Sequence, residues 1–121
     1  MRYVIQGDVF IIDMSEITPE MEHYQKGNRP AVIVGNDSNN KFCDLVQMIP
    51  LTTKKDNLPQ HVPVYVKGRL SYAMPEMIVT VHKILLKKWI TNLKKDGQYE
   101  NIKKSMRIQF REEHSGNERN R

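Results

Sequence analysis

Five short apolar runs rich in β-branched residues lie in the first two thirds of the chain, and polar stretches separate them. Runs of this length with Val and Ile predict β-strands, and the polar clusters between them predict turns and loops. We expect strands at about 9–12, 31–35, 44–51, 61–66 and 77–81. The polar stretch over residues 13–28 is long for a connection in a small domain, and such loops are usually functional.

The period of the pattern changes after residue 84. Leu85, Leu86, Trp89, Ile90 and Leu93 recur three and four residues apart, which predicts an amphipathic helix. Asp96-Gly97 ends it, and a last helix is expected over about 98–112. Five strands followed by helices predict a mainly β (α+β) fold, a small antiparallel barrel with short helices and a C-terminal helix.

The 121 residues are enough for one domain, which we place at 1–113, followed by a flexible polar tail at 114–121. No apolar stretch is long enough for a transmembrane helix, and the first residues lack the apolar core of a signal peptide. Cys43 is the only cysteine and cannot form an internal disulfide. A reducing, cytoplasmic location without membrane contact is the simplest interpretation.

The net charge of +5 is unevenly distributed. Residues 83–111 carry nine Lys and Arg against two Asp and Glu, whereas residues 1–82 carry eight against nine. Such an excess favours a polyanionic partner, nucleic acid first. The alternative is that these lysines lie on solvated helix faces and serve solubility.

The segment Gly27-Asn28-Arg29-Pro30 precedes the predicted strand at 31–35. Because proline disfavours the helical conformation in the residue before it, Arg29 is expected to be extended at the mouth of a rigid strand. A guanidinium held there can bind a phosphate with its planar fork of donors. The alternative is an ordinary surface arginine, since charged side chains are mostly exposed.

Polar segments that follow strands meet at one end of a small antiparallel barrel. Arg29 closes the first such segment, Thr52 and Thr53 open the second, and Lys54, Lys55 and His61 follow them. A guanidinium, hydroxyls, ammonium groups and an imidazole together are typical of an oxyanion or phosphate site. No metal-binding cluster, glycine-rich phosphate loop or nucleophile elbow occurs, so we expect no cofactor and catalysis without metal.

Several segments in this order resemble the MazF/PemK/Kid family of bacterial toxins. They are Gly7-Asp8-Val9-Phe10 with Asp13, Gly27 to Val34, Asn36-Asp37 with Asn40-Lys41-Phe42, Ile49 to Thr53, and Leu58 to Val62. The resemblance implies an SH3-like, CcdB-type barrel that forms homodimers. It further implies metal-independent, sequence-specific cleavage of single-stranded messenger RNA to a 2′,3′-cyclic phosphate and a 5′-hydroxyl. The implied partner is a cognate antitoxin with an extended acidic tail.

The resemblance assigns the catalytic arginine to Arg29 and the catalytic threonine to Thr52, and it places His61 near an RNA groove. The family usually has Gly-Ser-Glu-Gln before Gly27, whereas this chain has Glu22-His23-Tyr24-Gln25. With tyrosine at the glutamate position, His23 is our hypothesis for the general base, with Glu22 as a second candidate. A loop histidine facing water is the alternative.

The expected RNA contacts are Tyr24, Gln25, Thr53, Lys54, Lys55 and His61, although a solvated loop explains the lysines equally well. Two other functions stay open. One is a protein-binding barrel like CcdB, which poisons DNA gyrase. The other is a silent relative that only binds antitoxin or RNA.

Overall fold

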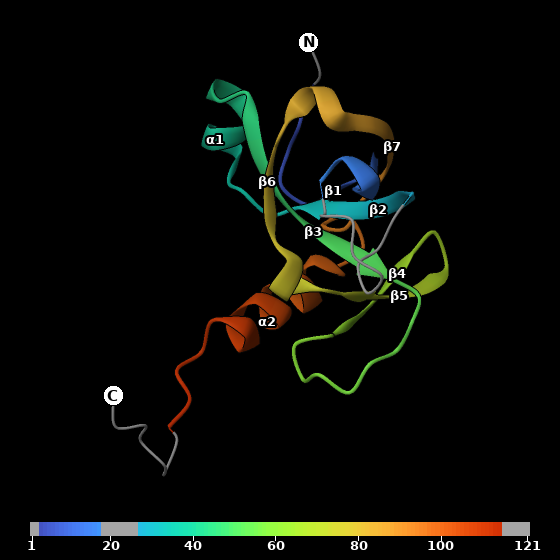
Figure 1. The fold of residues 1–121 in the computed structure, drawn as a ribbon, viewed down its shortest axis with the longest axis vertical. Coiled ribbons are helices and arrows are strands. Elements are labelled where there is room, and N and C mark those ends of the chain that lie inside the picture. The colour runs from blue at the N-terminus through green and yellow to red at the C-terminus, as the bar shows by residue number, and fades with distance from the viewer. Residues whose placement is uncertain (1–2, 18–26, 115–121) are drawn as a thin grey trace.

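The computed structural model describes residues 3–17 and 27–114. Its strands form one strongly bent antiparallel sheet in the order β4-β5-β3-β2-β1-β7, and β6 pairs with the first half of β3 (Figure 1). The strands are β1 (Asp8–Asp13), β2 (Asn28–Ile33), β3 (Leu45–Thr52), β4 (Pro63–Val66), β5 (Arg69–Ala73), β6 (Val79–His82) and β7 (Leu86–Asn92). This half-barrel confirms the predicted mainly β fold class.

Both faces of the central strands are buried. Successive side chains of a strand point to opposite faces, so the run Ala31-Val32-Ile33-Val34 divides between two apolar clusters. Val32 and Val34 join the cluster with Tyr99 and Ile102 of the C-terminal helix, and Ala31 and Ile33 join the cluster around Phe10 and Met48. Burial on both sides explains why this segment is continuously apolar rather than alternating.

In the described part of the chain, two α-helices and three short 3₁₀ helices accompany the sheet. They are α1 (Asp37–Phe42), α2 (Tyr99–Gln109), η1 (Met14–Glu16), η2 (Pro75–Met77) and η3 (Lys83–Leu85). The predicted C-terminal helix is confirmed as α2, which lies near the β4–β5 end of the sheet (Figure 1). The sequence pattern predicted only a turn where α1 forms. The side chain of Asn36 caps α1 by accepting a hydrogen bond from the Asn39 N–H at 2.8 Å.

The predicted helix over residues 85–93 is wrong, because residues Leu86–Asn92 form strand β7 along β1. The β1–β7 pairing has two register shifts, between Val9 and Phe10 and between Ile11 and Ile12. Such irregularities disturb the alternation of a strand. Leu86 belongs to one apolar cluster, Ile90 packs against the other, and Trp89 is 44% exposed, so the helical spacing of these residues does not mark a single buried face.

The strand boundaries differ from the prediction in two further places. β5 (Arg69–Ala73) was not predicted, because it has no β-branched residue. The strand expected at 77–81 is instead η2 followed by β6, because Pro75 begins a short helical turn. β5 contributes Arg69 and Ser71 to the lining of a cavity of about 700 Å³.

The Gly7-Asp8 pair anchors β1 to its neighbours. Gly7 has φ +94°, and a Cβ on it would meet the Asn92 Oδ1 at 2.8 Å. The Asp8 carboxylate is 4% exposed and accepts hydrogen bonds from three groups. The donors are the Ile5 N–H, the Trp89 indole N–H and the Asn92 side-chain amide. Only glycine suits both the backbone and the space at position 7.

Candidate functional site

A cavity of about 700 Å³ opens where the start of β2, the end of β3 and the β4–β5 hairpin meet. Its cationic lining residues are Arg29, Lys54, Lys67 and Arg69. Its hydroxyls are those of Thr52, Thr53 and Ser71, and its apolar lining includes Ile11, Leu51 and Ile90. No carboxylate belongs to the lining that the structure describes, so the cavity suits an anion with an apolar part.

Arg29 is the second residue of β2 and lies opposite Ile12 of β1. Pro30 follows it and keeps it extended, as the sequence predicted. The side chain is exposed, and no described acidic residue forms an ion pair with it. The guanidinium is therefore fixed at its base by the strand and available at its head to an anion.

Thr52 is the last residue of β3 and lies opposite Tyr72 of β5. Its Oγ1 accepts a hydrogen bond from the Lys54 N–H at 3.1 Å. This turn fixes the side chain, and because the oxygen acts as the acceptor there, the hydroxyl proton remains to be donated elsewhere. Thr52 can thus present a hydrogen-bond donor to a ligand in the cavity.

The register of β2 and β3 brings Arg29 and Thr52 together. Ala31 pairs with Pro50 at the end of this antiparallel ladder. Continuing this register two residues beyond the last pair would set Arg29 opposite Thr52, on the same face of the sheet. Both residues line the cavity. The structure therefore brings together the two side chains that the sequence singled out.

The other predicted site residues lie in different places. Thr53 and Lys54 line the cavity, whereas Lys55 does not belong to its lining. His23, Tyr24 and Gln25 lie outside the described residues, so their predicted roles as base and RNA contacts stay predictions, as does the alternative base Glu22.

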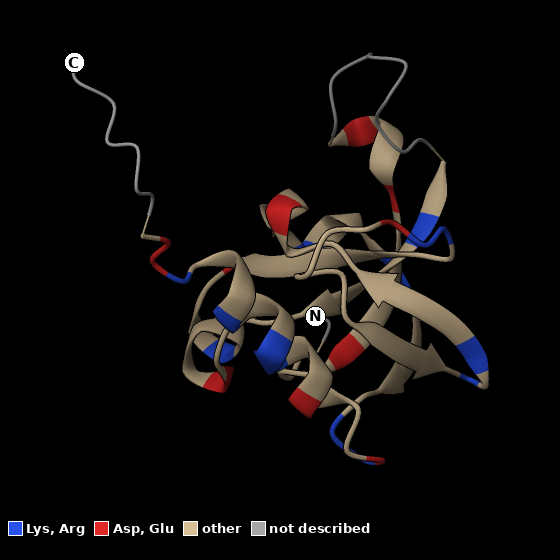
Figure 2. Cartoon of the chain, turned by 90° about the horizontal axis from the view of Figure 1, so that it is seen from below, with Lys and Arg blue, Asp and Glu red and all other residues tan. Residues whose placement is uncertain are grey.

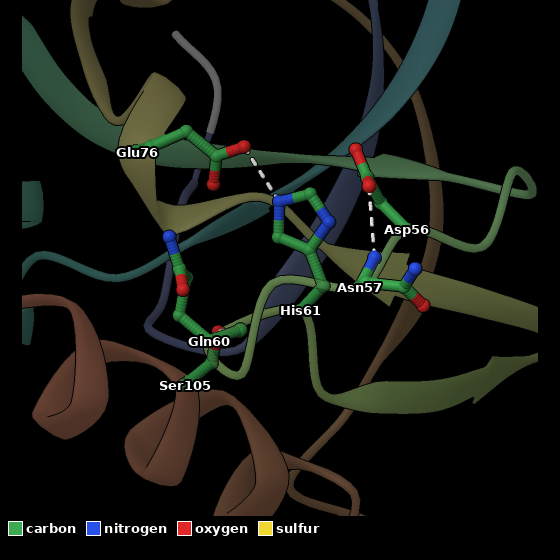
Figure 3. A network of polar contacts seen from close by, with 6 residues as sticks. All are labelled: Asp56, Asn57, Gln60, His61, Glu76 and Ser105. Atoms are coloured by element: carbon green, nitrogen blue, oxygen red, sulfur yellow. Dashed lines mark hydrogen bonds and ion pairs between the residues drawn. The ribbon is translucent and has the colours of Figure 1, made fainter.

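His61 lies outside the cavity lining, in the connection before β4 (Figure 3). Its side chain is 4% exposed, and its Nε2 lies 2.5 Å from the Glu76 carboxylate of η2. The Ser105 hydroxyl of α2 donates to the neighbouring Gln60 carbonyl. These contacts hold the β3–β4 connection against η2 and α2, a structural role that the sequence did not reveal; direct RNA contact by His61 stays a prediction.

Lys67, Arg69 and Ser71 are among the cavity residues that sequence reasoning missed. They belong to the hairpin of β4 and β5, and β5 was not predicted. The available signal was the pair Lys67-Gly68 directly after the alternating run of β4, since a glycine in a two-residue connection is typical of a hairpin turn.

The basic excess of residues 83–111 does not line the cavity, to which this segment contributes only Ile90. Figure 2 shows Lys and Arg on α2 at the left of the view and at the tip of the β4–β5 hairpin at the right. On α2, Lys103 forms an ion pair with Glu100 at 2.8 Å. The cations of the cavity therefore come from residues 1–82, whose total charge is close to balanced, and not from the segment with the basic excess.

A second cavity of about 340 Å³ lies by the start of α2 and is lined by Gln6, Lys94, Tyr99 and Glu100 among others. Burial raises the pKa of Tyr99 to about 12, and the nearby charge of Asp37 adds to the increase. Tyr99 is therefore neutral at physiological pH. It is the first residue of α2 and packs into the apolar cluster that α2 covers.

Within residues 3–17 and 27–114, no three His, Cys, Asp or Glu side chains gather closely enough to hold a metal ion. None of the helices in the described part of the chain combines the length and apolarity that a membrane crossing requires.

Comparisons with known proteins find relatives in sequence and in fold. A relative named Endoribonuclease MazF, from Staphylococcus saprophyticus, is 34% identical over 94 residues, which span 73% of this chain and 76% of the relative. The crystal structure of MazF from Deinococcus radiodurans has a TM-score of 0.69 at 16% identity, covering 88% of this chain and 96% of that one. An endoribonuclease in complex with its cognate antitoxin, from a mycobacterial species, has a TM-score of 0.66 at 21% identity, covering 88% and 92%.

Residues 5–110 match the family described as "PemK-like, MazF-like toxin of type II toxin-antitoxin system". This match covers every element of the sheet and all of α2. The chain therefore belongs to the PemK-like, MazF-like family of type II toxin–antitoxin toxins.

Proposed function

We propose that this protein is the toxin of a toxin–antitoxin pair and a sequence-specific endoribonuclease that cleaves single-stranded messenger RNA in the cytoplasm without a metal ion. The observation that carries the proposal is that Arg29 and Thr52 line the same cavity, whose described lining also contains Lys54, Lys67 and Arg69. The relative with 34% identity is itself named an endoribonuclease, which supports the reaction class.

The proposed reaction is an internal transfer. The ribose 2′-oxygen attacks phosphorus, the bond from phosphorus to the 5′-oxygen breaks, and the products are a 2′,3′-cyclic phosphate and a 5′-hydroxyl. The 2′-hydroxyl loses its proton to a base, for which His23 is our first candidate and Glu22 our second, and the leaving 5′-oxygen takes up a proton.

Arg29 and Thr52 act on the charge that develops at phosphorus. Arg29 is always protonated, so it serves as a clamp on the non-bridging oxygens rather than as the base. Thr52 donates its hydroxyl proton to a non-bridging oxygen. Fixed donors of this kind act where charge develops in the transition state, and each typically contributes about 100–1,000-fold in rate.

Binding contacts extend the site beyond the scissile phosphate. Thr53 and Lys54 line the same cavity, and Tyr24, Gln25, Lys55 and His61 remain proposed RNA contacts. Aromatic stacking on unpaired bases is sequence-tolerant, so sequence preference would come from the polar contacts.

We further propose a homodimer and a cognate antitoxin whose extended acidic tail covers the cavity. A cavity with four cations and no described carboxylate in its lining is complementary to such a tail. A neighbour of this fold was solved with its cognate antitoxin, and another as a MazE–MazF pair, which supports this partner class.

The test is cleavage of a mixed RNA by the purified protein in the presence of EDTA, with mapping of the new 5′ ends. Arg29→Ala is expected to abolish cleavage, and Thr52→Ala to lower kcat/KM about 100–1,000-fold, whereas Thr52→Ser retains the donor and most of the rate. Lys104→Gln, an exposed cation of α2, is the control and leaves the rate unchanged.

RNA left intact by the wild-type protein, or cleavage that persists in Arg29→Ala, would refute the proposal. Trapped cleaved DNA in a gyrase assay would instead support the CcdB-like alternative. The base is tested separately by the pH–rate profile of His23→Ala, since an unchanged profile would assign proton removal to another group such as Glu22.

A further inference from the structure

The β4–β5 hairpin turns through only two residues, Lys67 and Gly68. Their φ angles are +51° and +78°, so both central residues of the turn are left-handed. Two-residue hairpins favour such turns, with Asn, Asp or Gly at these positions. Lysine has a Cβ and gains no local side-chain hydrogen bond there, so its conformation costs about 1–2 kcal/mol relative to a favoured backbone. Strain at an unsuited residue points to a function for that residue.

The tip of the hairpin carries its charges into the catalytic cavity. Arg69 pairs with Val66 across the hairpin, and both residues line the cavity together with Lys67. Arg69 and Ser71 are two residues apart on β5 and therefore lie on the same face. Ser71 is 3% exposed and also lines the cavity. The face of β5 that carries Arg69 and Ser71 therefore lines the cavity.

The hairpin cations lie at a different level from Thr52. Thr52 pairs with Tyr72, and Arg69 lies three residues further along β5. At about 3.4 Å per residue, the backbone of Arg69 is roughly 10 Å along the strand from the Thr52 level. Arg29 and Thr52 therefore form one anion-binding level of the cavity, and Lys67 and Arg69 form a second.

The second level has two cations and no described counter-ion. Neither Lys67 nor Arg69 takes part in any ion pair among residues 3–17 and 27–114. Like charges held close together repel one another unless an anion lies between them. A linear polyanion that enters at Arg29 and Thr52 and continues past the hairpin would supply this anion.

We propose that Lys67 and Arg69 form a second phosphate-binding subsite, which holds a backbone phosphate of single-stranded RNA distinct from the scissile one. This inference rests on the proposed function and deepens it, since it specifies how the substrate extends from the reacting phosphodiester. The rigid two-residue turn keeps the two cations in position, so the RNA backbone meets a preorganised clamp. The strain at Lys67 is retained because asparagine, which suits the turn, would remove a charge from the clamp.

The test uses Lys67→Asn, which preserves the left-handed turn and removes the charge, and the double variant Lys67→Asn/Arg69→Gln. Lys104→Gln on α2 is the charge-matched control. The probe is a mixed-sequence 2′-O-methyl RNA oligonucleotide, which lacks the attacking hydroxyl and stays intact. Its affinity is measured by fluorescence anisotropy over a range of salt concentrations, and the melting temperature of each variant is measured in parallel.

Each lost phosphate contact is expected to reduce the slope of log affinity against log salt by about 0.7. With this slope change, lowering the salt from 1 M to 0.1 M strengthens RNA binding by the variant about fivefold less than binding by the wild type. Lys67→Asn is also expected to keep or raise the melting temperature, which separates lost binding from lost folding. KM for RNA cleavage rises in both hairpin variants, whereas Lys104→Gln changes neither the slope nor KM.

An unchanged salt slope and KM in the double variant would overturn the subsite, even if the wild-type protein cleaves RNA as proposed. The subsite is also overturned if the hairpin variants bind poly-glutamate more weakly than the wild type but bind RNA equally well. The hairpin would then serve an acidic protein partner. If the wild-type protein binds the probe with a slope that depends on Lys67 but cleaves no RNA, the subsite stands and the proposed catalytic function fails.

Discussion

Replacing Asp8 with asparagine tests how β1 and β7 are held together. Asp8 is 4% exposed, and its carboxylate accepts hydrogen bonds from two directions. Oδ2 accepts from the Ile5 N–H at 2.9 Å, and Oδ1 accepts from the Trp89 indole N–H and the Asn92 amide, both at 3.0 Å. Asp8→Asn keeps the shape of the side chain but turns one acceptor oxygen into a donor.

The expected loss follows from these contacts. The asparagine can keep its oxygen toward Trp89 and Asn92, but its NH₂ group then faces the Ile5 N–H, and that hydrogen bond is lost. A hydrogen bond to a charged acceptor contributes about 1.5–3 kcal/mol, and an unsatisfied buried donor costs about 1–3 kcal/mol. Removing the charge also relieves part of its desolvation cost. We therefore expect a loss of about 2–3 kcal/mol in the free energy of unfolding.

Urea unfolding followed by tryptophan fluorescence and by circular dichroism measures this loss directly. Trp89 is the only tryptophan and donates its indole N–H to Asp8, so its emission also reports the local change. Asp44→Asn, at an exposed position, is the control. If Asp8→Asn unfolds within about 0.5 kcal/mol of the wild type, as surface substitutions do, the structural role assigned to the carboxylate is wrong.

Two further substitutions test buried polar groups. The Tyr99 hydroxyl is buried and has no hydrogen-bond partner among the described residues, so Tyr99→Phe should leave stability at neutral pH unchanged or raise it by about 1 kcal/mol. Because burial raises the pKa of Tyr99 to about 12, the wild type should lose its Tyr99 contribution as the pH rises from about 10 through 12, by up to about 2–3 kcal/mol. The prediction is wrong if the free energies of unfolding of the wild type and of Tyr99→Phe change by the same amount over that pH range. His61→Asn should lower the free energy of unfolding by about 1–3 kcal/mol, because the contact with Glu76 is lost. If the variant instead keeps its melting temperature and binds RNA more weakly, His61 contacts RNA.

Local patterns in the sequence predicted much of the sheet and part of the site. Branched apolar runs marked β1 to β4, and helical spacing marked α2. The proline after Arg29 and the hydroxyls at the end of β3 identified cavity residues, because these signals act within a few residues of the backbone that they shape.

Long-range pairing decided the remaining elements. The helical spacing of residues 85–93 arises in an extended strand whose pairing with β1 contains two register shifts, and no local pattern reveals those shifts. The hairpin cations Lys67 and Arg69 were missed for a related reason. β5 has weak local preferences and becomes a strand by pairing with β3 and β4.

The sequence by itself determined which residues can bind and stabilise a phosphate, namely Arg29 and Thr52, since charge and hydrogen-bonding capacity belong to the side chains. Only the tertiary structure decided that these two line one cavity, that Lys67 and Arg69 join them, and that His61 is buried against Glu76. The physical reason is that strand register depends on hydrogen bonds between segments far apart in the chain. Local propensity carries no information about which residues those bonds will bring together.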